Sequence, residues 1–136
     1  MADRLTAYGL GVEVPLPYDQ AVERTKAELA REGFGVLTEI DVRDTLKRKL
    51  DVEFRPYVIL GACNPPLAHR ALSAERNIGL LLPCNVIVYA ADAPGRSVVA
   101  ALDPVEQLKL AGNPALEPLA ADVRQRLERV LERVAG

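Results

Sequence analysis

Apolar residues follow two kinds of pattern along the chain, one typical of strands and one typical of helices. Five segments alternate or run apolar as strands do, at residues 4–14, 34–40, 54–63, 82–91 and 96–102. In the first, one side carries Tyr8, Leu10, Val12 and Val14. This period of two predicts a strand with one buried face. In the third, Val58, Ile59 and Leu60 are apolar on both faces, which indicates a central, covered strand.

Two longer segments repeat apolar residues at steps of three and four, as amphipathic helices do. Residues 19–32 carry an inner stripe of Val22, Thr25 and Leu29, and Gly33 suits the left-handed cap that ends a helix. The second helix starts at about residue 118. Its stripe consists of Leu116, Ala120, Val123, Leu127, Val130 and Val134.

Two shorter helices are predicted from their capping residues. Asp41 caps the first, with Asp44 three residues further on, and its inner stripe is Val42, Leu46 and Leu50. Asn64 caps the second, with Pro65 at the first helical position, and this helix runs to about residue 76.

The order of these elements is strand, helix, four strands, helix, with small helices inserted. Because the connections are short or contain a single helix, we expect an α+β fold in which the main helices pack on one face of an antiparallel sheet. Residues 1–136 contain no linker or repeat, which predicts one domain. The exposed sheet edges and the apolar second face of the sheet predict a two-fold homodimer.

Composition and charge narrow the function. The net charge of −2 gives no general attraction to nucleic acid or to anionic membranes. The first 14 residues lack the pattern of a signal peptide, and no apolar run approaches the roughly 20 residues that span a bilayer. We therefore expect a cytoplasmic protein with no membrane partner, whose two cysteines are thiols.

Two similar phrases hold those cysteines and define the candidate site. Residues 61–65 read Gly-Ala-Cys-Asn-Pro, and residues 82–85 read Leu-Pro-Cys-Asn. If the third and fourth strands are antiparallel neighbours, the end of one meets the start of the next, so the phrases come together in space. The predicted ligand-binding residues are Cys63, Asn64, Pro65, Pro83, Cys84 and Asn85.

Two kinds of chemistry and one purely structural explanation fit these residues. The helix after Asn64 directs its first amides towards the site, which favours an anion or a thiolate there. A thiolate would permit sulfur transfer or a redox relay, with one of Cys63 and Cys84 as nucleophile and the other resolving it. Equally, the cysteines can be small core residues and Asn64 only a cap.

Other candidates are weaker. His69, Cys63 and Cys84 supply only three zinc ligands, without a Cys-x-x-Cys motif, so we expect neither a metal nor another cofactor. The basic residues Arg43, Lys47, Arg48, Lys49 and Arg55 form one cluster. With only six aromatic residues in the chain, we do not expect this cluster to bind nucleic acid.

Three longer phrases carry a resemblance to a known family. Residues 33–41 (GFGVLTEID), 57–65 (YVILGACNP) and 81–86 (LLPCNV) resemble the domain of unknown function family 302. The resemblance spans nearly the whole chain. It implies a fold similar to one repeat of the TATA-box-binding protein and a homodimer, but no function.

From the sequence we therefore expect a homodimeric module that binds a small molecule or an anion near the two Cys-Asn phrases. The alternative is a thiol-based sulfur-transfer or redox protein that uses Cys63 and Cys84. No specific reaction is predicted.

Overall fold

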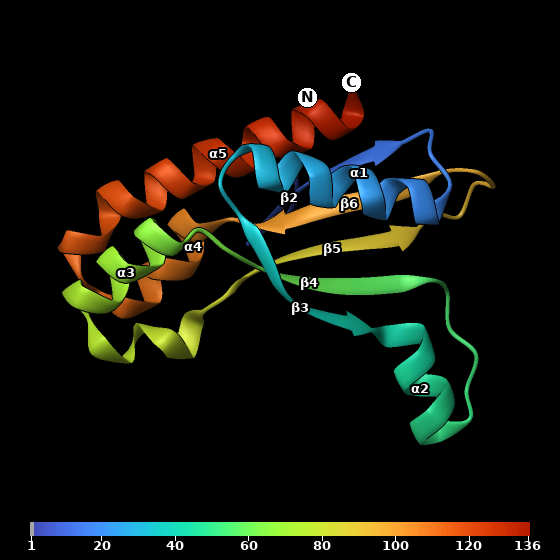
Figure 1. Ribbon diagram of the computed structural model, residues 1–136, viewed down its shortest axis with the longest axis horizontal. Coiled ribbons are helices and arrows are strands. Elements are labelled where there is room, and N and C mark those ends of the chain that lie inside the picture. Colours follow the sequence, from blue (N-terminus) through green and yellow to red (C-terminus); the bar gives the residue numbers. More distant parts are fainter. Residues whose placement is uncertain (1) are drawn as a thin grey trace.

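A computed structural model describes residues 2–136 and contains one six-stranded sheet with helices on one face (Figure 1). The strands are β1 (Asp3–Thr6), β2 (Gly9–Val14), β3 (Gly35–Asp41), β4 (Tyr57–Cys63), β5 (Cys84–Ala90) and β6 (Ser97–Leu102). The α-helices are α1 (Tyr18–Arg31), α2 (Val42–Leu50), α3 (Pro65–Ala74), α4 (Pro104–Leu108) and α5 (Glu117–Ala135). Short 3-10 helices are η1 (Arg76–Leu81), η2 (Lys109–Ala111) and η3 (Pro114–Leu116).

The strand order is β1-β2-β6-β5-β4-β3, and every neighbouring pair is antiparallel. Strands β3 to β6 lie side by side in chain order, while β2 pairs with β6 across the sheet. The predicted α+β class and antiparallel sheet are confirmed.

One face of the sheet and the inner sides of α1 and α5 form the core. Alternate strand residues such as Val58, Leu60, Val86 and Val88 are buried there. The whole predicted stripe of α5 is buried as well, from Leu116 to Val134. Burial of this continuous apolar layer is the main force that holds the helices on the sheet.

The prediction of a single first strand at residues 4–14 is wrong. The chain turns at residues 7 and 8, so the segment forms the hairpin β1-β2, and the sheet has six strands instead of five. Tyr8, predicted to share the buried face with Leu10, lies in this turn and is 63% exposed. The turn residues Ala7 and Tyr8 are not among those that usually mark a tight turn, so no local signal revealed the hairpin.

Helix α2 also differs from its prediction. Asp41 caps it as expected, accepting a hydrogen bond from Asp44 N at 2.9 Å. However, no residue of α2 is buried, and Leu50 of the predicted inner stripe is exposed. The helix projects from the β3 end of the sheet (Figure 1), where it lies against strands β3 and β4.

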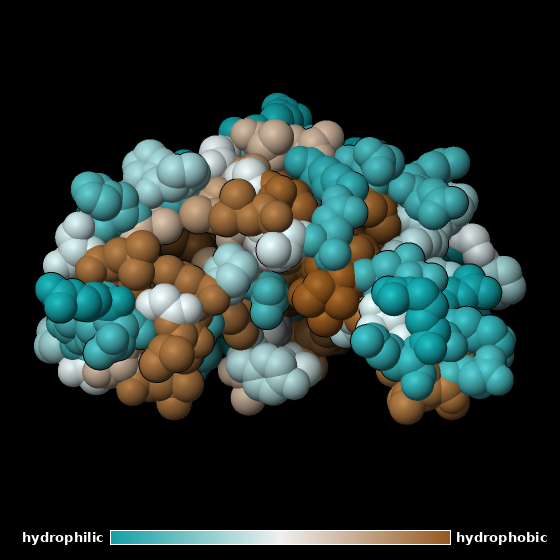
Figure 2. Space-filling view, turned by 60° about the horizontal axis from the view of Figure 1, so that its bottom comes forward, coloured by the Kyte–Doolittle hydropathy of each residue, from teal (hydrophilic) through white to brown (hydrophobic). Residues whose placement is uncertain are grey.

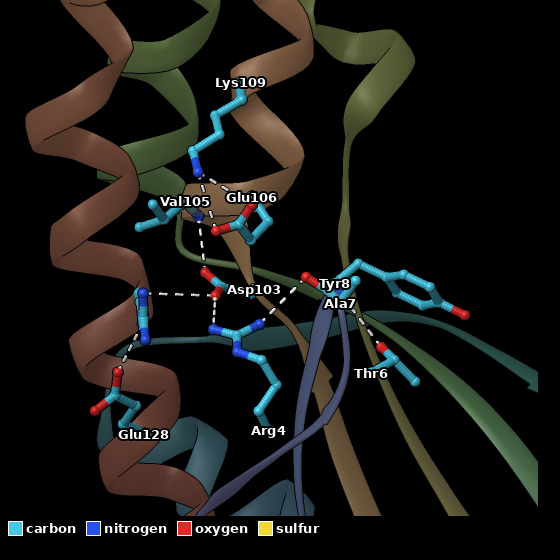
Figure 3. A network of polar contacts seen from close by, with 10 residues as sticks. Arg4, Thr6, Ala7, Tyr8, Asp103, Val105, Glu106, Lys109 and Glu128 are labelled. Atoms are coloured by element: carbon cyan, nitrogen blue, oxygen red, sulfur yellow. Dashed lines mark hydrogen bonds and ion pairs between the residues drawn. The ribbon is translucent and has the colours of Figure 1, made fainter.

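Two buried carboxylates join elements distant in the sequence. Glu32, which follows α1, pairs with Arg129 at 2.8 Å and with Arg133 at 2.6 Å, both on α5. These hydrogen bonds, with Arg129 the larger contribution, lower the pKa of Glu32 to about 2. Asp103 caps α4 through Val105 N and pairs with Arg4 at 2.7 Å (Figure 3). It thereby connects β1, β6 and α4.

Within residues 2–136, no helix has both the length and the apolar character that crossing a bilayer requires.

Candidate functional site

The two Cys-Asn phrases meet at one end of the sheet. Cys63 is the last residue of β4 and Cys84 the first of β5, and Ala62 lies directly opposite Cys84 in the antiparallel register. Between them the chain forms α3 and η1 and returns through the cis peptide bond Leu82–Pro83. The predicted juxtaposition of the phrases is confirmed.

A pocket of about 360 Å³ opens at this end of the sheet. Figure 2 shows apolar residues gathered around a hollow at its left, the end that carries α3 and η1 in Figure 1. The lining comes from β3 and the residue before it, from the ends of β4 and β5, and from α3, η1, α4 and α5. It consists of Phe34, Leu37, Thr38, Ala62, Cys63, Asn64, Leu67, Ala68, Ala71, Leu72, Gly79, Leu82, Pro83, Cys84, Pro104, Gln107, Leu108, Leu119 and Val123. Leu37 and Leu72 are exposed, so the pocket reaches the surface beside them.

Four of the six predicted site residues line this pocket and two do not. Cys63, Asn64, Pro83 and Cys84 are part of the lining. Pro65 is exposed at the start of α3, outside the pocket. Asn85 is exposed too, because successive residues of a strand point to opposite faces and Cys84 takes the pocket side.

Asn64 links the pocket to the end of α1. Its Oδ1 accepts a hydrogen bond from Leu67 N at 3.4 Å, which confirms the predicted cap of α3. Its Nδ2 donates to the carbonyl of Glu32 at 3.3 Å. Next to Glu32, Gly33 has a φ of +84°, and a Cβ there would lie 3.0 Å from Asn64 Nδ2. The left-handed conformation and the tight contact both favour glycine.

The expectation that α3 offers free amides to an anion is wrong. Proline has no N–H, and Pro65 and Pro66 occupy the first two positions of the helix. The next two amides are already bonded, Leu67 N to Asn64 Oδ1 and Ala68 N to the Asn64 carbonyl. The residues that make this helix start so well defined therefore also remove its capacity to bind an anion.

The two cysteines are free thiols, each half-buried. Burial, and secondarily the proximity of Cys63, raises the pKa of Cys84 from 9.0 to about 11. A raised pKa keeps Cys84 protonated at neutral pH, whereas a nucleophilic cysteine needs the opposite shift. The Cys84 thiol therefore contributes apolar, polarizable surface to the pocket.

Gln107 is the polar residue that stands out in the lining. Its Nε2 donates to the carbonyl of Leu81 at 2.5 Å, whereas its Oε1 is buried without a hydrogen-bond partner. The amide orientation follows from the first contact, because a carbonyl oxygen only accepts and must face the NH2 group. An unpartnered acceptor thus remains beside the pocket.

His69 and the basic cluster lie away from the pocket. His69 is exposed on α3. The basic residues are exposed as well, and most are paired: Arg48 with Asp44 at 2.8 Å, Lys47 with Asp51 at 2.8 Å, and Arg55 with Asp92 at 3.0 Å. These pairs reduce the positive charge available to a nucleic acid.

Sequence reasoning missed the larger part of the pocket wall. Val123 belongs to the predicted stripe of α5, and Leu67 and Ala71 lie in the predicted helix after Asn64, but neither pattern indicates a cavity. Gln107 carried no recognisable signal, because a glutamine in a short helix is ordinarily a surface residue. Only the folded arrangement brings these side chains together.

These observations define the class of the protein: it has an antiparallel α+β fold with an apolar pocket at one end of its sheet. The family model for a domain of unknown function, DUF302, matches residues 10–134, so the chain belongs to this family. The resemblance noted in its three sequence phrases is confirmed.

One solved structure shows the same fold over almost the whole chain. It is the crystal structure of an uncharacterized conserved protein DUF302 from Bacillus stearothermophilus. The two chains share 33% identity with a TM-score of 0.87, and the similarity covers 95% of this chain and 99% of the other. No curated protein matches the chain.

Proposed function

We propose that this protein is a small-molecule-binding module whose ligand occupies the pocket between the β4–β5 end of the sheet and helix α3. The observation that carries the proposal is an almost entirely apolar pocket of about 360 Å³ at the point where the two Cys-Asn phrases meet. Protein interiors leave few voids larger than a water molecule, and ligand pockets begin at roughly 300 Å³. A cavity of this size is expected where a ligand binds.

Binding is favoured over the alternative of thiol chemistry. Sulfur transfer or a redox relay needs a thiolate as nucleophile, and the pKa of Cys84 near 11 opposes that role for Cys84 at neutral pH. In this proposal Cys63 and Cys84 shape the pocket wall, and Asn64 fixes the start of α3 beside it.

Native mass spectrometry of the purified protein tests the proposal. We expect the native mass to exceed that of the protein alone, as a monomer or dimer of the 14.8 kDa chain, by the mass of a small molecule, and this excess should disappear after solvent extraction. Saturating benzene provides a second test, because apolar cavities bind it without a specific polar contact.

A matched pair of variants on α3 locates the binding. Ala68 lines the pocket and is half-buried, whereas Ala74 is exposed on the same helix and outside the pocket. Ala68→Phe should abolish both the copurified mass and benzene binding, and Ala74→Phe should preserve them. A wild-type protein that carries no ligand and does not bind benzene would refute the proposal.

We also propose that the module is a homodimer that associates through the sheet face opposite the helices. The register places Ile40, Ile59 and Ile87 directly across from one another on neighbouring strands. Val58 and Val86 alternate with Ile59 and Ile87 and are buried on the helix side, so the isoleucines lie on the other face. Tyr57 and Tyr89 stack on this face with ring centroids 5.3 Å apart. Apolar side chains in such a continuous row favour association with a second copy.

A further inference from the structure

The lining of the pocket restricts the chemistry of what it can hold. No residue among those described that line the pocket is charged. The lining is mainly aliphatic, with leucine, alanine, valine and proline side chains and the two thiols. Moving an ionised carboxylate or phosphate from water into such surroundings carries a large desolvation penalty that no nearby cation would offset.

The beginning of α3 does not change this conclusion. A helix N-terminus is the other common partner for an anion, but here its first two residues are prolines and the next two amides are already bonded. Neither the side chains of the lining nor the backbone at the start of α3 therefore provides a partner for an anion.

Gln107 adds a directional preference. A buried acceptor without a partner is unfavourable. Flipping the amide would not help, because Nε2 already donates to the Leu81 carbonyl and Oε1 could not replace it there. A hydroxyl or N–H group on a bound molecule would supply the missing donor. Because Oε1 is covered by neighbouring atoms, this contact requires the Gln107 amide to rotate towards the pocket.

We propose that the pocket selects an uncharged, hydrocarbon-rich small molecule that carries one hydrogen-bond donor, and that Gln107 Oε1 accepts this hydrogen bond. The inference rests on the proposed binding function and names the class of its ligand. At about 360 Å³, the pocket is at the small end of the range for ligand sites, which favours a compact molecule.

Three probes with similar numbers of heavy atoms separate the possibilities. 1-Octanol is uncharged and donates a hydrogen bond, 1-methoxyheptane is uncharged and only accepts, and heptanoate is anionic at neutral pH. Calorimetric titration should give 1-octanol the highest affinity. We expect the ether to bind about three- to tenfold more weakly, the typical net contribution of one hydrogen bond, and heptanoate to bind at least tenfold more weakly than 1-octanol.

A variant at Gln107 assigns the hydrogen bond. Gln107→Met retains the length and apolar stem of the side chain but removes the acceptor. It should reduce the affinity for 1-octanol to that for the ether while leaving ether binding unchanged, and unchanged ether binding also reports an intact pocket. If the ether is lost too, the same comparison in Gln107→Leu provides the second test, because leucine removes the acceptor with a side chain of different shape, and the preference for 1-octanol over the ether should again disappear.

Each outcome bears on a separate claim. If none of the three probes binds, and benzene fails as well, the binding function itself is refuted. If the probes bind but heptanoate equals or exceeds 1-octanol, the pocket binds ligands and the proposed class is wrong. If 1-octanol and the ether bind equally to the wild type, the role of Gln107 is refuted.

Discussion

At the scale of single residues, the side chains around the pocket are held by contacts that leave little freedom for substitution. Asn64 is bonded to both Leu67 N and the Glu32 carbonyl, so it fixes the start of α3 relative to the end of α1. Gly61 is similarly confined, between Thr38 on β3 and Pro83 before β5. The shape of the pocket depends on such close contacts between neighbouring strands.

Gly61→Ala should destabilise the protein. A Cβ at this position would clash with Thr38 Oγ1 and would lie 2.9 Å from Pro83 Cγ, and the proline ring cannot rotate away. Overpacking of this kind raises the free energy of the folded state by roughly 1–3 kcal/mol. The urea midpoint of unfolding measures the effect.

Gly35→Ala is the matched control. Its added Cβ would approach only the Cys63 carbonyl oxygen, at 4.0 Å, an ordinary van der Waals distance. Equal urea midpoints for the two variants would contradict the steric argument.

Cys84 should react slowly with thiol reagents. Its pKa near 11, two units above the ordinary value of 9.0, reduces the thiolate fraction at neutral pH by about a hundredfold. Timed alkylation with iodoacetamide in a Cys63→Ser background, read by mass spectrometry, should show this slower rate relative to free cysteine. The rate should rise as the pH approaches 11 and on unfolding. A rate in the native protein that matches free cysteine at neutral pH would instead support the thiol alternative.

At the scale of elements, Glu32 joins the end of α1 to α3 and α5, two helices that line the pocket. Its carboxylate pairs with Arg129 and Arg133 on α5, and its carbonyl accepts from both Asn64 and Arg126. The ends of α1 and α5 and the start of α3 therefore meet at one residue. Loosening this junction should affect global stability rather than a single helix.

The free energy of unfolding should fall as the pH decreases from about 5 to about 2. The folded-state pKa of Glu32 is depressed from 4.5 to about 2, so its contribution is present above pH 4.5 and disappears as the carboxylate becomes protonated. Glu32→Gln should lower stability at pH 7 by about 2 kcal/mol, a value reduced for the partial exposure of the two arginines, and should flatten the acid dependence.

Glu23→Gln, on the helix α1 that Glu32 follows, serves as the control. Glu23 is 76% exposed on its side chain, and its pair with Lys26 is long, at 3.8 Å. Chemical denaturation across this pH range should show the wild-type acid dependence for this variant. An unchanged slope in Glu32→Gln would refute the assignment.

Local signals in the sequence predicted most elements but not how they close around a cavity. Capping residues located the starts of α2 and α3, since Asp41 and Asn64 bond to their own helices through contacts three residues apart. The β1-β2 hairpin was not predicted because its turn residues, Ala7 and Tyr8, are not among those that usually mark a tight turn. The contribution of Gln107 depends on Leu81, 26 residues away, and no local pattern encodes such a contact.

At the scale of the whole molecule, the two faces of the sheet differ in what covers them. Helices bury one face, while the opposite face presents the row of Ile40, Ile59 and Ile87. The pocket opens at one end of the sheet, near α3, and α2 projects from another part of the molecule (Figure 1). The proposed dimer face and the proposed ligand site are thus built from different sets of residues.

Light scattering after size-exclusion chromatography should give a mass of about twice 14.8 kDa. Ile40 is 49% exposed, so Ile40→Lys should place an unpaired charge in the proposed interface and yield a monomer without disturbing the core. Leu110→Lys, at a residue that is 79% exposed on η2, should remain dimeric. A wild-type protein of monomer mass would exclude the dimer, and a dimeric Ile40→Lys would exclude this face.

The most direct test of the binding site is a methyl NMR titration with 1-octanol. The alanine methyl groups of Ala62, Ala68 and Ala71 line the pocket, whereas Ala74 and Ala100 lie outside its lining. Saturable shifts confined to the first three alanines are expected, and they should vanish in Ala68→Phe at the two alanines that remain. Shifts centred on the open face of the sheet or on α2, or no saturable shifts at all, would contradict the account.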